Sequence, residues 1–168
     1  WRFAAGLAVA AAYIAVAVLQ RRAILAKPDI LERFGRTFGA AMPLMPKTAA
    51  ERRGFQAVSI TAGICEEFFY RGFVMWYVGA FAGPIVAIIL SSAAFGFDHI
   101  YLGRTYVLRS GIGGVAFSLL VLLSGSLWPA IVVHTIADLL SGDIGERLVS
   151  GQSRWSAASM ATSARAPI

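Results

Sequence analysis

Seven ionisable side chains stand inside or at the ends of apolar stretches, where charged groups are rare. In chain order they are Glu66, Glu67, Arg71, Asp98, His99, His134 and Asp138. They include both histidines of the chain and four of its nine carboxylates. Each ionised group at bilayer depth costs about 2.5 to 3.5 kcal/mol on insertion scales. Charged residues that are merely tolerated would not be gathered in so few apolar stretches. The set therefore predicts a functional site.

The spacing of these residues predicts which of them can meet. Glu67 and Arg71 are four residues apart on a predicted helix, so Arg71 can neutralise Glu67 in a structural ion pair. Glu66 points about 100° away and lacks that partner. His134 and Asp138 are also four apart, so the carboxylate can orient the imidazole or share a bound ion with it.

The net charge of these ionisable residues limits the kinds of chemistry that the site can support. Four carboxylates against the single guanidinium of Arg71 leave a formal charge of −3. A low-dielectric site must relieve this excess by protonation, by water or by a bound cation. Imidazole and carboxylate groups are ligands that zinc accepts, and Glu66, His99 and His134 are the candidate ligands. A carboxylate held in such a site can also take a proton from water, so we expect a site that activates water.

The composition indicates the elements that must position these groups. Of the 168 residues, 58% are hydrophobic and 14% are charged, and the mean hydropathy is +0.69. Ordinary soluble domains carry about 25% charged residues, so a soluble globular protein is excluded. A disordered chain would need low hydrophobicity, and a single cysteine excludes a disulfide scaffold. The fold class that remains is an all-α, polytopic transmembrane helix bundle.

Apolar runs long enough to cross a bilayer, about 17 to 25 residues each, recur along the chain. We expect about five spans in four regions. The regions are a first span at 1–19, a basic cytoplasmic loop at 20–54, a core with the remaining spans at 55–141, and a polar, mobile tail at 142–168. The pair Gly83-Pro84 should separate the second span from the third.

The basic residues indicate topology. Residues 20–54 hold eight basic and three acidic residues, a local charge of +5. With this loop in the cytoplasm and five spans, 13 of the 15 basic residues lie inside, and only Arg2 and Arg71 do not. The positive charge therefore reports orientation in the membrane, and we expect no nucleic-acid partner.

Two segments near the N-terminus leave alternatives open. Ile30, Leu31, Phe34 and Phe38 follow a helical period, which suits a short helix in the headgroup layer or a solvated turn. The first span could be a cleaved signal sequence, although the eight basic residues that follow would then be exported. Because the chain starts at Trp1, we expect it to be a fragment with further spans upstream.

Three motifs in this order resemble those of one family. Glu66 to Arg71 fits the pattern EExxxR, Phe95 to His99 fits FxxxH, and His134 to Asp138 fits HxxxN or HxxxD. Each lies in an apolar span, and together they cover roughly residues 55–141. On these motifs the sequence resembles the CPBP intramembrane proteases, also called the ABI or type II CAAX prenyl endopeptidase family.

The resemblance implies peptide hydrolysis in or beside the membrane, with roles for the motif residues. Glu66 would activate water together with His99, and His134 and residue 138 would face the oxyanion or a metal. Glu67 would belong to the catalytic set but, with Arg71, mostly shape the site. Many members carry Asn where this chain has Asp138, and an ionised carboxylate cannot donate a hydrogen bond to an oxyanion. Asp138 would therefore be protonated, bind a metal or hold His134.

The sequence thus predicts an intramembrane endopeptidase, of the metallo or glutamate type, in a bacterial plasma membrane with its site open to the cytoplasm. Its partners would be the lipid bilayer and a membrane-associated peptide or protein, CAAX-like and prenylated or of the bacteriocin type. Zn²⁺ or another divalent cation is the candidate cofactor. The alternatives are an ion- or proton-coupled transporter, because membrane carboxylate and histidine chains also relay ions, and a noncatalytic immunity or scaffold protein.

Overall fold

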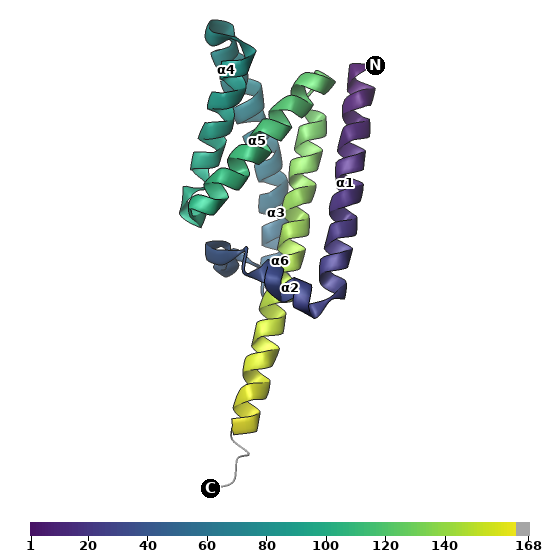
Figure 1. The fold of residues 1–168 in the computed structure, drawn as a ribbon, viewed down its shortest axis with the longest axis vertical. Helices are drawn as coiled ribbons and strands as arrows, with labels where there is room; N and C mark the ends of the chain where they lie inside the picture. The colour runs from purple at the N-terminus through teal and green to yellow at the C-terminus, as the bar shows by residue number, and fades with distance from the viewer. Residues whose placement is uncertain (164–168) are drawn as a thin grey trace.

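The computed structural model describes the backbone of residues 1–163 and the side chains of residues 1–151. This part of the chain is helical and contains no strand, so the expected all-α bundle is confirmed. The helices are α1 (Arg2–Ala26), α2 (Pro28–Gly35), η1 (Gly39–Leu44), α3 (Ala49–Glu66), the π-helix η2 (Glu67–Val74), α4 (Met75–Asp98), η3 (Ile100–Leu102), α5 (Arg104–Ser124) and α6 (Trp128–Ser163). Figure 1 shows the longer helices standing side by side.

Three continuous helical segments within residues 1–163 are long and apolar enough to cross a membrane. They are Arg2–Ala26, Ala49–Asp98 and Arg104–Ser124. The second holds 50 residues and reverses direction at Gly83, whose φ of 81° and ψ of 169° leave the helical region. Gly79 and Ala87 consequently face each other across the turn. The expected break at Gly83-Pro84 is confirmed, and this segment supplies two antiparallel arms (Figure 1).

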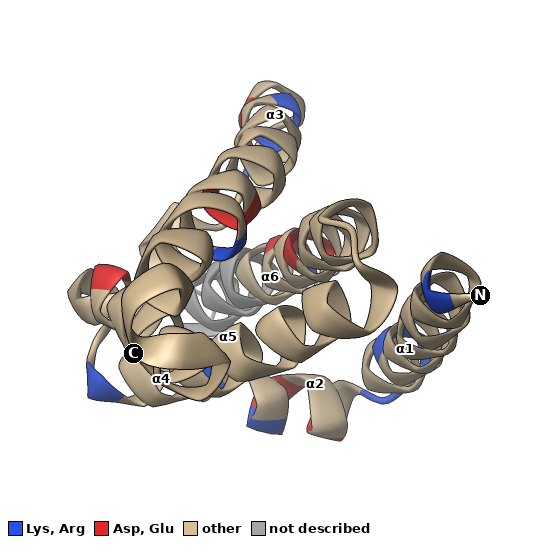
Figure 2. Ribbon diagram, turned by 90° about the horizontal axis from the view of Figure 1, so that it is seen from above, with Lys and Arg blue, Asp and Glu red and all other residues tan. Residues whose placement is uncertain are grey.

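Large apolar side chains point outward from the bundle, as expected for helices in lipid. Phe81 and Ile85, for example, are 80% and 73% exposed. The chain is therefore an integral membrane protein, because water would not tolerate an apolar surface of this extent. Figure 2 shows acidic positions on α3 and α6, and these two helices pack against each other.

Helix α6 differs from the expectation for the C-terminal region. It continues from Trp128 to Ser163, so no element ends at residue 141, and Ile144 and Leu148 are buried in a core cluster. The segment after residue 141 is thus helical rather than a separate tail, because its apolar side chains pack against the connection between α1 and α3. Residues 164–168 lie outside the described part. Helix α6 is not among the helices found long and apolar enough to cross a membrane, so the number of five spans stays a prediction.

The connection between α1 and α3, residues 27–48, is shorter than the expected loop of residues 20–54. Helix α1 continues to Ala26, and α3 begins at Ala49 behind a capping box formed by Thr48 and Glu51. The expected short helix is present as α2. Phe38 and Met45 of this connection pack against α6, which places the connection under one end of the bundle.

Helices α3 and α6 approach each other closely at Gly63. A Cβ atom at this position would clash with the Thr135 side chain and lie 3.1 Å from the Thr135 backbone nitrogen. Glycine therefore lets the two backbones come together. Thr135 follows His134 in α6 and Gly63 lies one turn before Glu66, so this contact sets the distance between the acidic and imidazole groups.

Candidate active site

The site begins where α3 changes into the π-helix η2. Glu67 opens this helix, and Arg71, four residues later, donates a hydrogen bond from Nη1 to Glu67 Oε1 at 2.8 Å. Both side chains are fully buried, and the predicted ion pair is confirmed. The Arg71 guanidinium also lies 4.2 Å from the centre of the Phe95 ring, a cation–π contact that partly replaces its hydration. Single π-helical turns are frequent at functional sites, and no sequence pattern had indicated this one.

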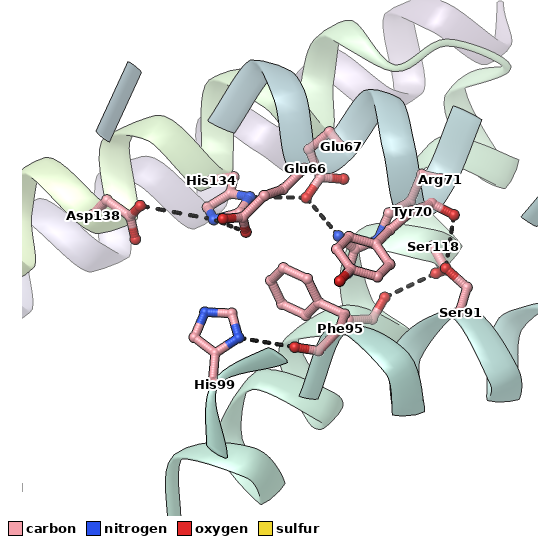
Figure 3. A network of polar contacts seen from close by, with 11 residues as sticks. Glu66, Glu67, Tyr70, Arg71, Ser91, Phe95, His99, Ser118, His134 and Asp138 are labelled. Atoms are coloured by element: carbon pink, nitrogen blue, oxygen red, sulfur yellow. Dashed lines mark hydrogen bonds and ion pairs between the residues drawn. The ribbon is translucent and has the colours of Figure 1, made fainter. Parts of the chain in front are cut away.

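Glu67 holds the His134 ring in place, whereas the sequence had suggested Asp138 for this role. Its Nδ1 lies 2.9 Å from Glu67 Oε1, which also accepts from Arg71. Because Glu67 is paired with a guanidinium and acts as an acceptor, Nδ1 carries the hydrogen and Nε2 is the free nitrogen. Nε2 lies 3.9 Å from Glu66 Oε2 and 3.8 Å from Asp138 Oδ2, distances of ion pairs rather than hydrogen bonds (Figure 3).

His99 is fixed by the backbone of its own helix end. Its Nδ1 lies 2.8 Å from the carbonyl oxygen of Phe95, and a carbonyl can only accept, so Nδ1 carries the hydrogen. Nε2 of the neutral ring then has its lone pair available. The Phe95 ring packs against both imidazoles, with centroid distances of 4.9 Å to His99 and 5.7 Å to His134. Both histidines thus present Nε2 as the reactive nitrogen.

One cavity of about 710 Å³ brings the candidate residues together. Its lining includes Glu66, His99, His134 and Asp138. Glu67 and Arg71 lie behind this wall and reach the cavity only through His134. Glu66 Oε2 is buried and has no hydrogen-bond partner among the described residues. The convergence that the spacing predicted is therefore present, and an acceptor oxygen faces two imidazoles across it.

Two aromatic residues near the site had not been singled out from the sequence. Tyr70 is buried and donates a hydrogen bond to Asp98 Oδ2 at 2.8 Å. Phe117 of α5 stacks on the His134 ring with a centroid distance of 5.1 Å and an interplanar angle of 17°. A tyrosine three residues after Glu67 was a weak signal for the first contact. Nothing in the sequence pointed to the second, because α5 carries no motif.

The donor set does not form a ready metal site. Within the described residues, no group of three or more His, Cys, Asp or Glu side chains is arranged to hold a metal ion. Nδ1 of His134 is bonded to Glu67 and Nδ1 of His99 to Phe95, so each ring has its Nε2 open, as metal-binding histidines commonly do. Among the described residues, only the missing group of three speaks against a metal. The expected ligands Glu66, His99 and His134 line the same cavity from different elements, but they do not form such a group of three.

The fold and the site define a polytopic helical membrane protein with an acid and imidazole cluster on the wall of one cavity. A family model described as type II CAAX prenyl endopeptidase Rce1-like matches residues 53–140, just over half of the 168 residues. The chain belongs to this family, which confirms the resemblance seen in the three motifs. The matched range contains all of the candidate site residues, and the family is one of membrane proteases. Comparisons with curated proteins and with solved structures found no match.

Proposed function

We propose that this protein is an intramembrane endopeptidase that hydrolyses peptide bonds with Glu66 as the general base. The observation that carries the proposal is the shared cavity, which is lined by Glu66 and by the imidazoles of His99 and His134 and in which Glu66 Oε2 makes no hydrogen bond to the described residues. A carboxylate is expensive inside a membrane, and a water molecule that Glu66 deprotonates gives this one a role.

In the proposed reaction, Glu66 accepts a proton from a water molecule that His99 Nε2 helps to orient. The water oxygen bonds to the carbonyl carbon of the peptide. The carbon–nitrogen bond then breaks, and the proton held by Glu66 moves to the leaving amine nitrogen. General acid–base catalysis of this kind contributes about 10²- to 10⁴-fold.

His134 would stabilise the oxyanion in this scheme, and Asp138 would act through His134. Once protonated, His134 can donate from Nε2 while Nδ1 stays bonded to Glu67. Asp138 Oδ2 at 3.8 Å from Nε2 favours this imidazolium by its charge. A carboxylate at position 138 is therefore compatible with hydrolysis, because it does not itself need to donate a hydrogen bond.

The proposal routes no step through a metal, since the described ligating groups do not gather into a three-ligand set. From the sequence we had expected Glu66, His99 and His134 to be ligands of a bound Zn²⁺ ion. The metallo and glutamate forms of the mechanism predict opposite responses to chelation, because a chelator would abolish the activity of the first and leave that of the second unchanged.

The cavity supports a cytoplasmic opening. Its lining continues to the α1–α3 connection, which lies within the stretch 20–54 that carries a local charge of +5. Basic segments of membrane proteins stay in the cytoplasm, so substrates would enter from that side of a bacterial plasma membrane. The name of the family makes peptides near a prenylated CAAX sequence the first substrates to test, with bacteriocin-type peptides second.

A cleavage assay on purified protein in detergent tests the proposal. We expect wild type to cleave such peptides and Glu66→Gln to be slower by about 100-fold or more, with the helical circular dichroism unchanged. His99→Ala should lose activity similarly, whereas Glu32→Gln, an exposed Glu-to-Gln control, should keep it. Full activity of Glu66→Gln would refute the mechanism.

The alternatives give different results in the same preparation. A transporter would carry ions or protons across liposomes without hydrolysing peptide, and its flux would depend on Glu66. An immunity or scaffold protein would keep its protective effect in cells when Glu66 is replaced by Gln.

A further inference from the structure

One buried side chain joins the motif that contains Glu66 to the motif that contains His99. Tyr70 stands in the π-helix η2, four residues after Glu66, and its hydroxyl donates a hydrogen bond to Oδ2 of Asp98 at 2.8 Å. Asp98 is the last residue of α4 and is followed directly by His99. Both partners occupy variable positions of their motifs, EExxxR and FxxxH, so the motifs assign no role to either.

Tyr70 contacts α4 at three points along one side of this helix. Its carbonyl oxygen accepts a hydrogen bond from Ser91 Oγ at 2.7 Å, and its ring packs edge to face on the Phe95 ring at a centroid distance of 5.3 Å (Figure 3). Its hydroxyl reaches Asp98. These partners follow one another at intervals of four and three residues, which places them on the same side of α4. Seven residues of helix correspond to about 10 Å, so a single residue of η2 holds this length of α4.

The hydroxyl acts at the end of α4, where a helix has least support of its own. The last carbonyl groups of a helix lack partners within it, and helix ends fray. His99 has already left the helical region, with φ −91° and ψ 11°. Gly96 brings this end close to α5, since a Cβ there would lie 2.6 Å from the Val107 carbonyl oxygen. Tyr70 holds the same end against η2, which begins directly after Glu66.

We propose that Tyr70 is a positioning residue for hydrolysis, whose hydroxyl, through Asp98, holds His99 Nε2 where it orients the water activated by Glu66. This inference rests on the proposed peptidase function. Glu66 and His99 line the cavity, whereas Tyr70 and Asp98 are not part of its lining, so the pair acts through His99 and not on the substrate. Glu66 and His99 stand on different elements, and a displacement of about 1 Å between reacting groups can cost about 100-fold in rate.

A positioning role differs from an electrostatic role in what Asp98 must provide. If its carboxylate acted on His99 by charge, removing the charge would matter and the Tyr70 hydroxyl would not. If Asp98 serves as the acceptor of the Tyr70 bond, an uncharged side chain with an acceptor oxygen at the same place suffices. The contacts favour the second role, because Asp98 Oδ2 is bonded to Tyr70 and, in the part of the chain that the structure describes, no ion pair joins Asp98 to His99.

Cleavage kinetics of purified variants test this role. Tyr70→Phe keeps the ring and removes the hydroxyl, so we expect kcat to fall about tenfold, as for the loss of one hydrogen bond to a charged group, with KM unchanged. Asp98→Ala should lower kcat by the same factor. Asp98→Asn keeps an acceptor oxygen and should retain the kcat of wild type. Tyr13→Phe, at a half-exposed tyrosine of α1 outside the cavity lining, is the matched control and should also retain it.

The histidine rings give a second measurement that needs no cleavage. The chain has two histidines, so ¹⁵N NMR of the imidazoles yields two sets of ring signals. His99 Nδ1 bonds to a backbone carbonyl of its own helix end, which selects one tautomer. Tyr70→Phe and Asp98→Ala should give a mixture of both tautomers at His99 and leave the His134 signals unchanged. A loss of stability spread over the whole bundle would alter both rings.

The outcomes distinguish this inference from the proposed function. If wild type cleaves no peptide, the proposed function fails and the role of Tyr70 fails with it. If wild type cleaves and Tyr70→Phe keeps its kcat, or loses only in KM, the positioning role alone is wrong. An equal loss in Asp98→Asn and Asp98→Ala would assign the effect to the charge of the carboxylate and overturn the inference. If Tyr70→Phe does not fold, Asp98→Ala, at an exposed residue, tests the same hydrogen bond from its other side.

Discussion

Glu67→Gln should destabilise the protein more than any other isosteric change of a carboxylate in the described residues. Glu67 is 0% exposed and its Oε1 accepts hydrogen bonds from Arg71 at 2.8 Å and from His134 at 2.9 Å. An amide keeps the shape of the carboxylate but removes its charge. The buried guanidinium of Arg71 would then lack a counter-ion.

The size of this effect follows from the burial of both partners. Nε and Nη2 of Arg71 already lack hydrogen-bond partners among the described residues, and the Phe95 ring is the main remaining compensation for the charge. Removing one member of a buried ion pair costs about 3 to 5 kcal/mol. Domains are stable by only about 5 to 15 kcal/mol, so the loss should be a large fraction of the total.

A matched pair elsewhere in the chain provides the control. Glu32 and Arg36 have the same four-residue spacing, but their closest atoms are 3.6 Å apart and both side chains are 77% exposed. Glu32→Gln should therefore change stability by less than about 1 kcal/mol. Adding Arg71→Met to Glu67→Gln removes both buried charges and should recover part of the loss, because the two effects are coupled.

Denaturant unfolding in detergent, followed by circular dichroism, measures these differences. If Glu67→Gln unfolds at the same denaturant concentration as Glu32→Gln, the buried pair does not stabilise the fold as argued. Equal stabilities of Glu67→Gln and its double variant would likewise show that an uncompensated Arg71 charge is not the cause.

Two other predictions concern packing and metal dependence. Gly63→Val should push α6 from α3 at Thr135, cost about 1 to 3 kcal/mol by overpacking and lower peptidase activity. Gly113→Val is the control, because a Cβ at this position of α5 meets nothing within 4 Å and the residue lies outside the cavity lining. Equal activity of both variants would contradict the packing argument. Chelators should leave the activity of purified wild type unchanged, as judged by cleavage rate alongside elemental analysis, whereas a loss that Zn²⁺ restores would show that a metal completes the site.

Much of the local arrangement could be predicted because it depends on helical spacing. The four-residue interval between Glu67 and Arg71 predicts their ion pair, and Gly83-Pro84 predicts the reversal of the chain. Both features arise from neighbours in the sequence. The continuation of α6 beyond residue 141 was not predicted, because Ser141-Gly142 resembles a helix stop but α6 is stabilised beyond it by contacts with the distant α1–α3 connection.

The sequence by itself determined the membrane-spanning helical class, the family and the set of residues that can do chemistry, because these depend on composition and on intervals within one helix. Only the tertiary structure decided that Glu67, not Asp138, holds His134, that Phe117 covers its ring, and that the cavity extends to Arg109. These contacts join residues far apart in the chain, and their geometry depends on how closely α3, α5 and α6 pack. Helical periodicity fixes the face on which a side chain lies, whereas packing selects the partner that it meets.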